Sequence, residues 1–252
     1  VLSDLNHASQ KGLQTIFDCS VGRSTVNHPL GGRYQLTPTE ASVQKLPVQH
    51  GVTHTASVMA QGFNPYVAEW SPYHGAAYAV IEATARLVAS GANWSKARFS
   101  YQEYFERMDK QAERFGQPVA ALLGSIEAQI QLGLPSIGGK DSMSGTFEEL
   151  TVPPTLVAFG VTTADSRNVL SPEFKAVGEN IYYIPGQALS AEIDFDLIKS
   201  NFAQFEALQK AHKVTSASAV KYGGVVESLA LATFGNHIGA EVTLPELETA
   251  LT

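Results

Sequence analysis

Residues 134–147 read LPSIGGKDSMSGTF, and the rest of the chain is organised around this stretch. An apolar run ends there in two adjacent glycines. The polar side chains that follow the glycines are Lys140, Asp141, Ser142 and Ser144. Glycines allow a backbone to approach a ligand closely, and exposed N–H groups beside a lysine and hydroxyls favour anions, phosphate above all. Because the spacing is not that of a P-loop, two interpretations stand: a phosphate-binding loop or a polar hairpin.

Composition and charge bound the class of protein. The chain has 252 residues, of which 44% are hydrophobic and 16% charged, so it is a folded globular protein with a sizeable core. A net charge of −7 argues against a nucleic-acid-binding surface. No apolar run approaches the roughly 20 residues of a membrane span. The single cysteine, Cys19, excludes an intrachain disulfide and fits the reducing cytoplasm, where we expect the protein to work. Because the chain opens with Val1, we expect it to be a piece of a longer polypeptide.

The N-terminal part of the sequence mixes helix and loop signals. Residues 1–16 predict a short amphipathic helix. Asp18 follows a short extended run and precedes a glycine loop, where a carboxylate serves either as a helix cap or as a metal ligand. Residues 27–47 predict one long ordered loop, which is usually functional in a compact domain. His50 and His54 have a zinc-ligand spacing, but the residues around them predict a strand, and no third ligand is evident.

The middle of the chain alternates between strands and helices. Residues 61–70 predict a turn and then a second short strand. We expect strands at 52–60, 97–101 and 155–163, and helices at 73–90, 103–115 and 119–132. This order predicts an α/β (α+β) fold, in which helices cover one face of a mixed sheet.

Glu82 and Arg86 stand four residues apart on one face of the helix expected over 73–90. One interpretation is an exposed ion pair, worth well under about 1 kcal/mol. The other is that Glu82 points into a metal or nucleotide site. The helix is apolar nearly all round, which makes a charged pair within it notable.

We place a domain boundary in the loop-rich segment 165–178, which gives one domain over 1–170 and a partial second domain over 171–252. In the second domain we expect a strand at 180–184, a helix at 194–212 and a further strand from Glu241. A glycine pair precedes a helix expected over 225–234. Such a pair either receives a phosphate at the helix N-terminus or allows close helix packing.

Several motifs together resemble phosphoribosylformylglycinamidine synthase, the glutamine-dependent ligase of purine biosynthesis. The motifs are FDCSVG (17–22), QLTPTEASV (35–43), GFNPYVAEWSPYHGA (62–76), QEYFE (102–106), IGGKDSMSGTF (137–147) and VPPTLVAFGV (152–161). Their order resembles the second synthetase half of the large single-chain form. The resemblance implies an aminoimidazole ribonucleotide synthetase-like N-terminal-type domain followed by the opening part of a C-terminal-type domain.

The resemblance also implies an activity, cofactors and partners. The expected reaction converts formylglycinamide ribonucleotide to formylglycinamidine ribonucleotide with ATP, Mg²⁺ and ammonia from glutamine. The expected partners are the remaining domains of the same polypeptide, a first synthetase half and a glutaminase, with no nucleic acid and no membrane. We expect the isolated piece to form a homodimer through its exposed sheet and to have no ligase or glutaminase activity. The sequence indicates no catalytic residue.

The family holds nucleotide phosphates through metal ligands, and the resemblance places two of these at Asp18 and Glu82. Arg86 stands where the family has asparagine, Ala219 where it has aspartate, and Lys221 where it has a phosphate-facing serine. Two metal ligands are therefore missing and two cations are present. Our hypothesis is that this site holds less magnesium or none, and that the two cations either balance the carboxylates directly or clasp phosphates without metal.

The same resemblance assigns Lys140, Asp141, Ser142 and Ser144 to a pocket for a substrate or nucleotide phosphate. We expect Asp18, Glu82 and Lys140 to converge on one phosphate-sized hollow. Two alternatives remain. The chain is a non-catalytic half that supplies an interface and an ancillary nucleotide site, or it belongs to another enzyme of the same superfamily.

Overall fold

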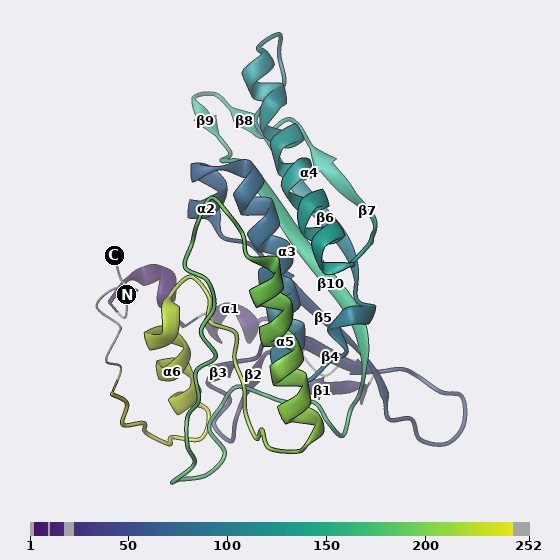
Figure 1. The fold of residues 1–252 in the computed structure, drawn as a ribbon, viewed down its shortest axis with the longest axis vertical. Helices are drawn as coiled ribbons and strands as arrows, with labels where there is room; N and C mark the ends of the chain where they lie inside the picture. Colours follow the sequence, from purple (N-terminus) through teal and green to yellow (C-terminus); the bar gives the residue numbers. More distant parts are fainter. Residues whose placement is uncertain (1–2, 10, 18–22, 244–252) are drawn as a thin grey trace.

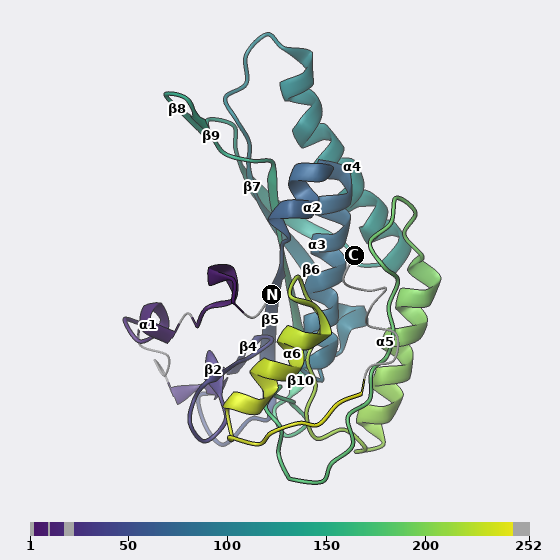
Figure 2. The same cartoon turned by 90° about the vertical axis from the view of Figure 1, so that its left-hand side faces the viewer.

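A six-stranded sheet, covered on one side by helices, forms the centre of the computed structural model (Figures 1 and 2). The structure describes residues 3–9, 11–17 and 23–243. The strands follow the spatial order β1-β4-β5-β10-β6-β7. In that order they are Thr25–Asn27, Ser42–Lys45, Thr55–Gly62, Thr155–Asp165, Arg98–Tyr104 and Ser136–Ser142. All neighbours are antiparallel except β6 and β7, which are parallel, so the predicted mixed α/β architecture is confirmed.

The helical layer lies on one side of this sheet, which Figure 2 shows edge-on. The layer contains α2 Pro65–Trp70, α3 Pro72–Ala89, α4 Ala112–Leu132 and α5 Phe195–Lys210. Helix α1, Lys11–Gln14, lies on the other side of the sheet in Figure 2, and α6 spans Gly224–Phe234. Short 3-10 turns occur at Leu5–His7 and Trp94–Lys96. Two small ribbons complete the fold, β2 Leu30–Gly31 with β3 Thr37–Pro38, and β8 Thr146–Phe147 with β9 Leu150–Thr151. No helix in the described part is long and apolar enough to cross a membrane.

Helix α3 sits close to the sheet because its inner face is built of small residues. The side chain of Ser71 accepts a hydrogen bond from the His74 N–H and caps the helix, as the sequence predicts. A Cβ at Gly62 of β5 would lie 2.1 Å from the Ala79 carbonyl oxygen of α3. The glycine therefore permits the approach that places the polar side chains of α3 beside the β5 backbone.

The two faces of the sheet differ in what covers them. Along β6, Phe99, Tyr101 and Glu103 are buried and alternate with residues of the opposite face, as the two-residue period of a strand requires. That opposite face carries Met59 and Val161, both exposed, and we call it the open face. Its apolar residues are candidates for association with another sheet.

Several sequence predictions about single elements are wrong. The helix expected at 103–115 does not begin at Glu103, because the buried alternation through Glu103 continues β6. Only its last residues, from Ala112, are helical, and they open the single helix α4, which runs to Leu132. Within 61–70 there is no second strand: Asn64 caps α2, with a proline in its first turn. Residues 27–47 hold short strands rather than one loop, and residues 1–16 hold only a 3-10 turn and α1 within their described part.

The C-terminal part contains α5 and α6 near the positions that the sequence predicts. The strands expected at 180–184 and from Glu241 are absent from its described residues, where no neighbouring strand offers hydrogen bonds to those segments. The domain boundary at 165–178 stays a prediction.

The LPSIGGKDSMSGTF stretch is not a loop throughout, because Ser136–Ser142 form the parallel edge strand β7.

Candidate functional site

Four charged residues from distant parts of the sequence meet beside α3. We call Glu40, Glu82, Arg86 and Lys221 the charge cluster. Lys221 Nζ lies 2.8 Å from Glu40 Oε1, and Arg86 Nε lies 3.2 Å from Glu40 Oε2. Arg86 Nη1 lies 3.9 Å from Glu82 Oε1. The four side chains therefore form one chain of alternating sign, Lys221–Glu40–Arg86–Glu82.

Backbone carbonyls fix the arginine in this cluster. Arg86 Nε donates to the carbonyl oxygen of Glu40, and its Nη1 donates to that of Gln61 on β5, each over 3.0 Å. The Glu40 side chain is only 3% exposed, and that of Arg86 18%. The planar guanidinium thus spans a strand, a loop and a helix at once, which a flexible lysine does less well.

Burial governs the electrostatics of this cluster. Desolvation raises the pKa of Glu82, while the nearby charges of Arg86 and Lys221 lower it and Glu40 raises it again. Two carboxylates face two cations, so the cluster has no net charge when all four groups are ionised. A neutral set of this kind has no net charge to attract Mg²⁺ or phosphate from a distance.

The N-terminus of α6 lies next to Lys221 in the sequence and binds a carboxylate of the chain itself. The Gly223 N–H donates to Glu227 Oε2 over 3.2 Å. His7 Nδ1 lies 2.8 Å from Glu227 Oε1, and the His7 ring stacks on Tyr222 at 5.2 Å between centroids. Both interpretations of the glycine pair, phosphate binding or close helix packing, stay predictions: a Cβ at Gly223 would lie 2.2 Å from Oε2 of Glu227, which belongs to the same helix.

The described residues of the charge cluster do not form a metal site. Mg²⁺ requires several oxygen ligands. In the part of the chain that the structure describes, no group of three or more histidine, cysteine or acidic side chains is placed to hold a metal ion. Glu82 and Glu40 are instead opposed by cations, and Ala219 offers no ligating side chain. The other predicted metal ligand, Asp18, lies outside the described residues, as does Cys19.

The glycine–lysine stretch, residues 138–144, is a second and different site. Lys140 is in register with Gln102 and Asp141 with Glu103, so Lys140 lies on the open face and Asp141 on the helix-covered face. Gln102 Nε2 donates to the Lys140 carbonyl oxygen over 2.9 Å. Among the described residues no ion pair involves Lys140 or Asp141, and both are exposed. Ser142 ends β7, and Ser144 lies in the segment that links β7 to β8.

Behind this stretch lies a buried acid that the sequence did not single out. Glu103 is 1% exposed, and its Oε2 has no hydrogen-bond partner among the described residues. Burial and, secondly, the charge of Asp141 raise the pKa of Glu103 to about 7. Glu103 is therefore neutral below that pH, which lowers the cost of its burial.

The two sites do not merge. Glu82 and Arg86 lie beside β5, whereas Lys140 is on β7, and β10 and β6 separate these strands. At about 4.8 Å per strand, the two strands are roughly 14 Å apart. The prediction that Glu82 and Lys140 converge on one hollow is therefore wrong within a single chain. The structure brings together Glu82, Arg86 and Lys221, and it holds the 140–144 residues elsewhere.

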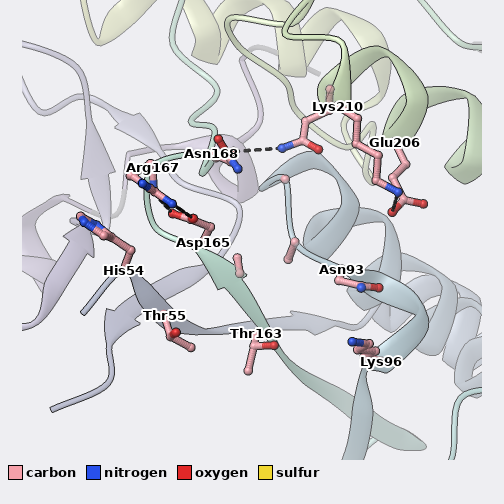
Figure 3. Close-up of a pocket in the computed structure, with 14 residues that line it drawn as sticks. His54, Thr55, Asn93, Lys96, Thr163, Asp165, Arg167, Asn168, Glu206 and Lys210 are labelled. Atoms are coloured by element: carbon pink, nitrogen blue, oxygen red, sulfur yellow. Dashed lines mark hydrogen bonds and ion pairs between the residues drawn. The ribbon is translucent and has the colours of Figure 1, made fainter. Parts of the chain in front are cut away.

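A third feature is an open cavity of about 610 Å³ at the ends of β5 and β10 (Figure 3). Arg167 lies against Asp165 at 2.5 Å, and Lys210 pairs with Glu206 at 2.7 Å. Most charged side chains that line it are therefore paired within the chain. The cavity offers a ligand few unengaged groups, and we assign it no role.

Sequence reasoning missed Glu40, Glu227 and Glu103. Glu40 belongs to the QLTPTEASV motif, but the segment was interpreted only as a loop. Glu227 stands in the first turn of α6, where a carboxylate complements the helix dipole, and that signal was available. Glu103 has no such signal, because its burial depends on the register between β6 and β7.

No protein-family model matches the chain. Among solved structures, PurLQS from Thermotoga maritima superposes with a TM-score of 0.66 at 17% sequence identity, over 95% of this chain and 36% of that one. The fold is that of PurL. T. maritima PurL complexed with ATP gives 0.66 at 16% identity, over 95% of this chain and 36% of that one. Phosphoribosylformylglycinamidine synthase II from T. maritima superposes with a TM-score of 0.61 at 17% sequence identity, over 89% of this chain and 33% of that one. The chain thus spans about a third of the length of the PurL structures that it matches.

Proposed function

We propose that the chain is part of an ATP-dependent ligase that converts formylglycinamide ribonucleotide to formylglycinamidine ribonucleotide with glutamine as the nitrogen source. Support comes from the PurL fold together with the IGGKDSMSGTF and GFNPYVAEWSPYHGA motifs. The observation that carries the proposal is the position of the first motif: in this fold it forms an exposed edge strand, and its lysine has no ion-pair partner among the described residues.

Within that ligase we assign Lys140, Ser142 and Ser144 to binding a phosphate group of substrate or nucleotide. Lys140 supplies charge from the open face, and the hydroxyls supply hydrogen bonds from the end of β7 and the segment that follows it. Asp141 lies on the other face, where it acts on Glu103. ATP with Mg²⁺ supplies the phosphoryl group and the neutralisation of its charge when bound. The ATP and glutaminase functions also require the partner domains named above.

The test is Lys140→Met in the full-length ligase. Loss of a phosphate-binding cation lowers kcat/KM for formylglycinamide ribonucleotide by about 10- to 100-fold, because a charged hydrogen bond contributes roughly 1.5–3 kcal/mol. Lys210→Met, which removes an exposed lysine of α5, is the matched control and leaves turnover unchanged. Equal turnover of the two variants contradicts the assignment of Lys140.

A second candidate function is favoured by the charge cluster, in which each cation lies within 4.0 Å of a carboxylate, although Glu40 Oε2 accepts no hydrogen bond from the described residues. The chain then serves as a structural half that positions the catalytic half of the ligase and pairs with it, or with a second copy of itself, through the open face. Under this proposal Lys140→Met leaves turnover per folded molecule unchanged, whereas Arg86→Met, in the charge cluster, lowers the melting temperature of the full-length enzyme. Under either proposal the isolated 252-residue chain shows no glutamine-dependent turnover.

A further inference from the structure

We infer that the charge cluster by itself links α3 to the segment that leads into α6, without a bound ligand. We call this link the electrostatic joint, and it takes the place of a metal–nucleotide complex between the two elements. The inference concerns how this half of the molecule is held together. It rests on the proposed function only in naming the ligand that the joint replaces.

Each cation of the cluster already has a carboxylate. Lys221 Nζ contacts Glu40 Oε1 at 2.8 Å, and Arg86 lies between Glu40 and Glu82. A phosphate that bound Lys221 in place of Glu40 would leave the Glu40 carboxylate, 3% exposed, with one cation instead of two. Removing one partner of a buried ion pair is strongly unfavourable, so phosphate competes poorly.

The carboxylates of the cluster are equally unsuited to a metal. Mg²⁺ at Glu82 would lie close to the Arg86 guanidinium, which is fixed by the Glu40 and Gln61 carbonyl oxygens. The positive charges of Mg²⁺ and of the Arg86 guanidinium would repel each other strongly in a partly buried site. The arginine cannot move aside without giving up both backbone hydrogen bonds.

The neighbouring anion position is also filled by the chain. Glu227 accepts the Gly223 N–H at the start of α6 and pairs with His7. At the other end of the same helix, Thr37 Oγ1 donates to the Leu231 carbonyl oxygen and accepts from the Gly235 N–H. Helix α6 is therefore fixed at both ends by side chains of the protein, and no ligand is needed to hold it in place.

Ligand titration of the unmodified chain tests this inference directly. The melting temperature is measured with EDTA, with Mg²⁺ alone, with inorganic phosphate and with Mg²⁺–ADP, each at millimolar concentration. We expect no shift beyond about 1 °C. A ligand present at 100 times its dissociation constant would raise the melting temperature by roughly 5–10 °C.

The Lys140→Met variant tells the two sites apart. A rise with Mg²⁺–ADP that disappears in Lys140→Met places the ligand at the glycine–lysine stretch and supports the joint. A rise in the melting temperature with Mg²⁺–ADP that persists in Lys140→Met overturns the inference, and so does a fall in the melting temperature with EDTA. These readouts do not involve turnover, so failure of the proposed ligase function leaves them unaffected.

A second test of the inference uses a variant that removes the positive charge of Lys221. Lys221→Met lowers the melting temperature by several degrees without ligand, and Mg²⁺–ADP does not restore it. Lys210→Met, whose pair with Glu206 is exposed, is the matched control and shifts the melting temperature by at most about 1 °C. Equal, small shifts for both variants overturn the inference.

Discussion

The charge cluster and the glycine–lysine stretch contain the same kinds of side chain, yet the fold treats them in opposite ways. In the cluster, Arg86 and Lys221 are mostly buried and paired with carboxylates. In the stretch, Lys140 lies on the open face of an edge strand without an ion pair among the described residues. In the cluster each cation faces a carboxylate of the chain, whereas in the stretch the lysine faces solvent.

Desolvation explains the difference. A buried charge must find its counter-ion within the chain, because water is not available to solvate it. An exposed lysine at a sheet edge is stabilised by water until a ligand replaces that water. Resemblance to a binding motif therefore says less about function than whether the fold leaves the motif's charges unsatisfied.

The largest expected effect comes from removing the cation at the centre of the cluster. Arg86→Met leaves Glu82 without its ion-pair partner and weakens the pairing of Glu40, so the free energy of unfolding falls by about 3–5 kcal/mol. Urea denaturation measures this change. Lys140→Met is the matched variant at the exposed site, with an expected change within about 0.5 kcal/mol. Similar losses for both variants would erase the contrast between the sites.

The next effect concerns Glu103, behind the glycine–lysine stretch. Because its folded pKa is raised to about 7, the folded state holds a proton that the unfolded chain has released, and stability falls as pH rises from about 4.5 to 7. Glu103→Gln removes this loss. The variant gains on the order of 2 kcal/mol relative to the parent chain between pH 5 and pH 8.

Thermal melts at both pH values measure that gain, and Glu149→Gln, at an exposed position, is its control. A parallel pH dependence in the parent chain and in Glu103→Gln would show that the Glu103 carboxyl does not titrate differently on folding.

A smaller effect tests the open face. We propose that the isolated chain dimerises through it, so Val161→Lys, on the exposed side of β10, weakens dimerisation about tenfold. Sedimentation equilibrium gives the dissociation constant. Ile130→Lys, on an exposed part of α4 in the helical layer, leaves it unchanged. A dimer that tolerates Val161→Lys but not Ile130→Lys assembles through the helices instead.

The smallest effect is at an exposed pair on α5. Lys210→Met removes an i,i+4 contact with Glu206 and lowers the free energy of unfolding by at most about 0.5 kcal/mol. Chemical denaturation in low and high salt measures it. A loss approaching that of Arg86→Met would mean that burial does not set the strength of these pairs.

Local rules predicted the elements whose ends carry their own signals. The helix expected over 73–90 became α3, the helix expected over 119–132 became the C-terminal part of α4, and the strand expected over 155–163 became β10. The errors fell where two rules compete. Residues 103–115 contain helix formers, but the alternating burial that includes Tyr101 and Glu103 extended β6 to Tyr104 instead.

The sequence by itself determined the fold class, the helix caps and the two sets of candidate side chains, because these follow from local periodicity, capping and composition. Only the tertiary structure decided which charges meet. Glu40 and Lys221 are 181 residues apart in sequence and 2.8 Å apart in space, whereas Glu82 and Lys140 lie beside strands that two others separate. Sheet order and strand register set such distances, and both depend on long-range packing that no local pattern encodes.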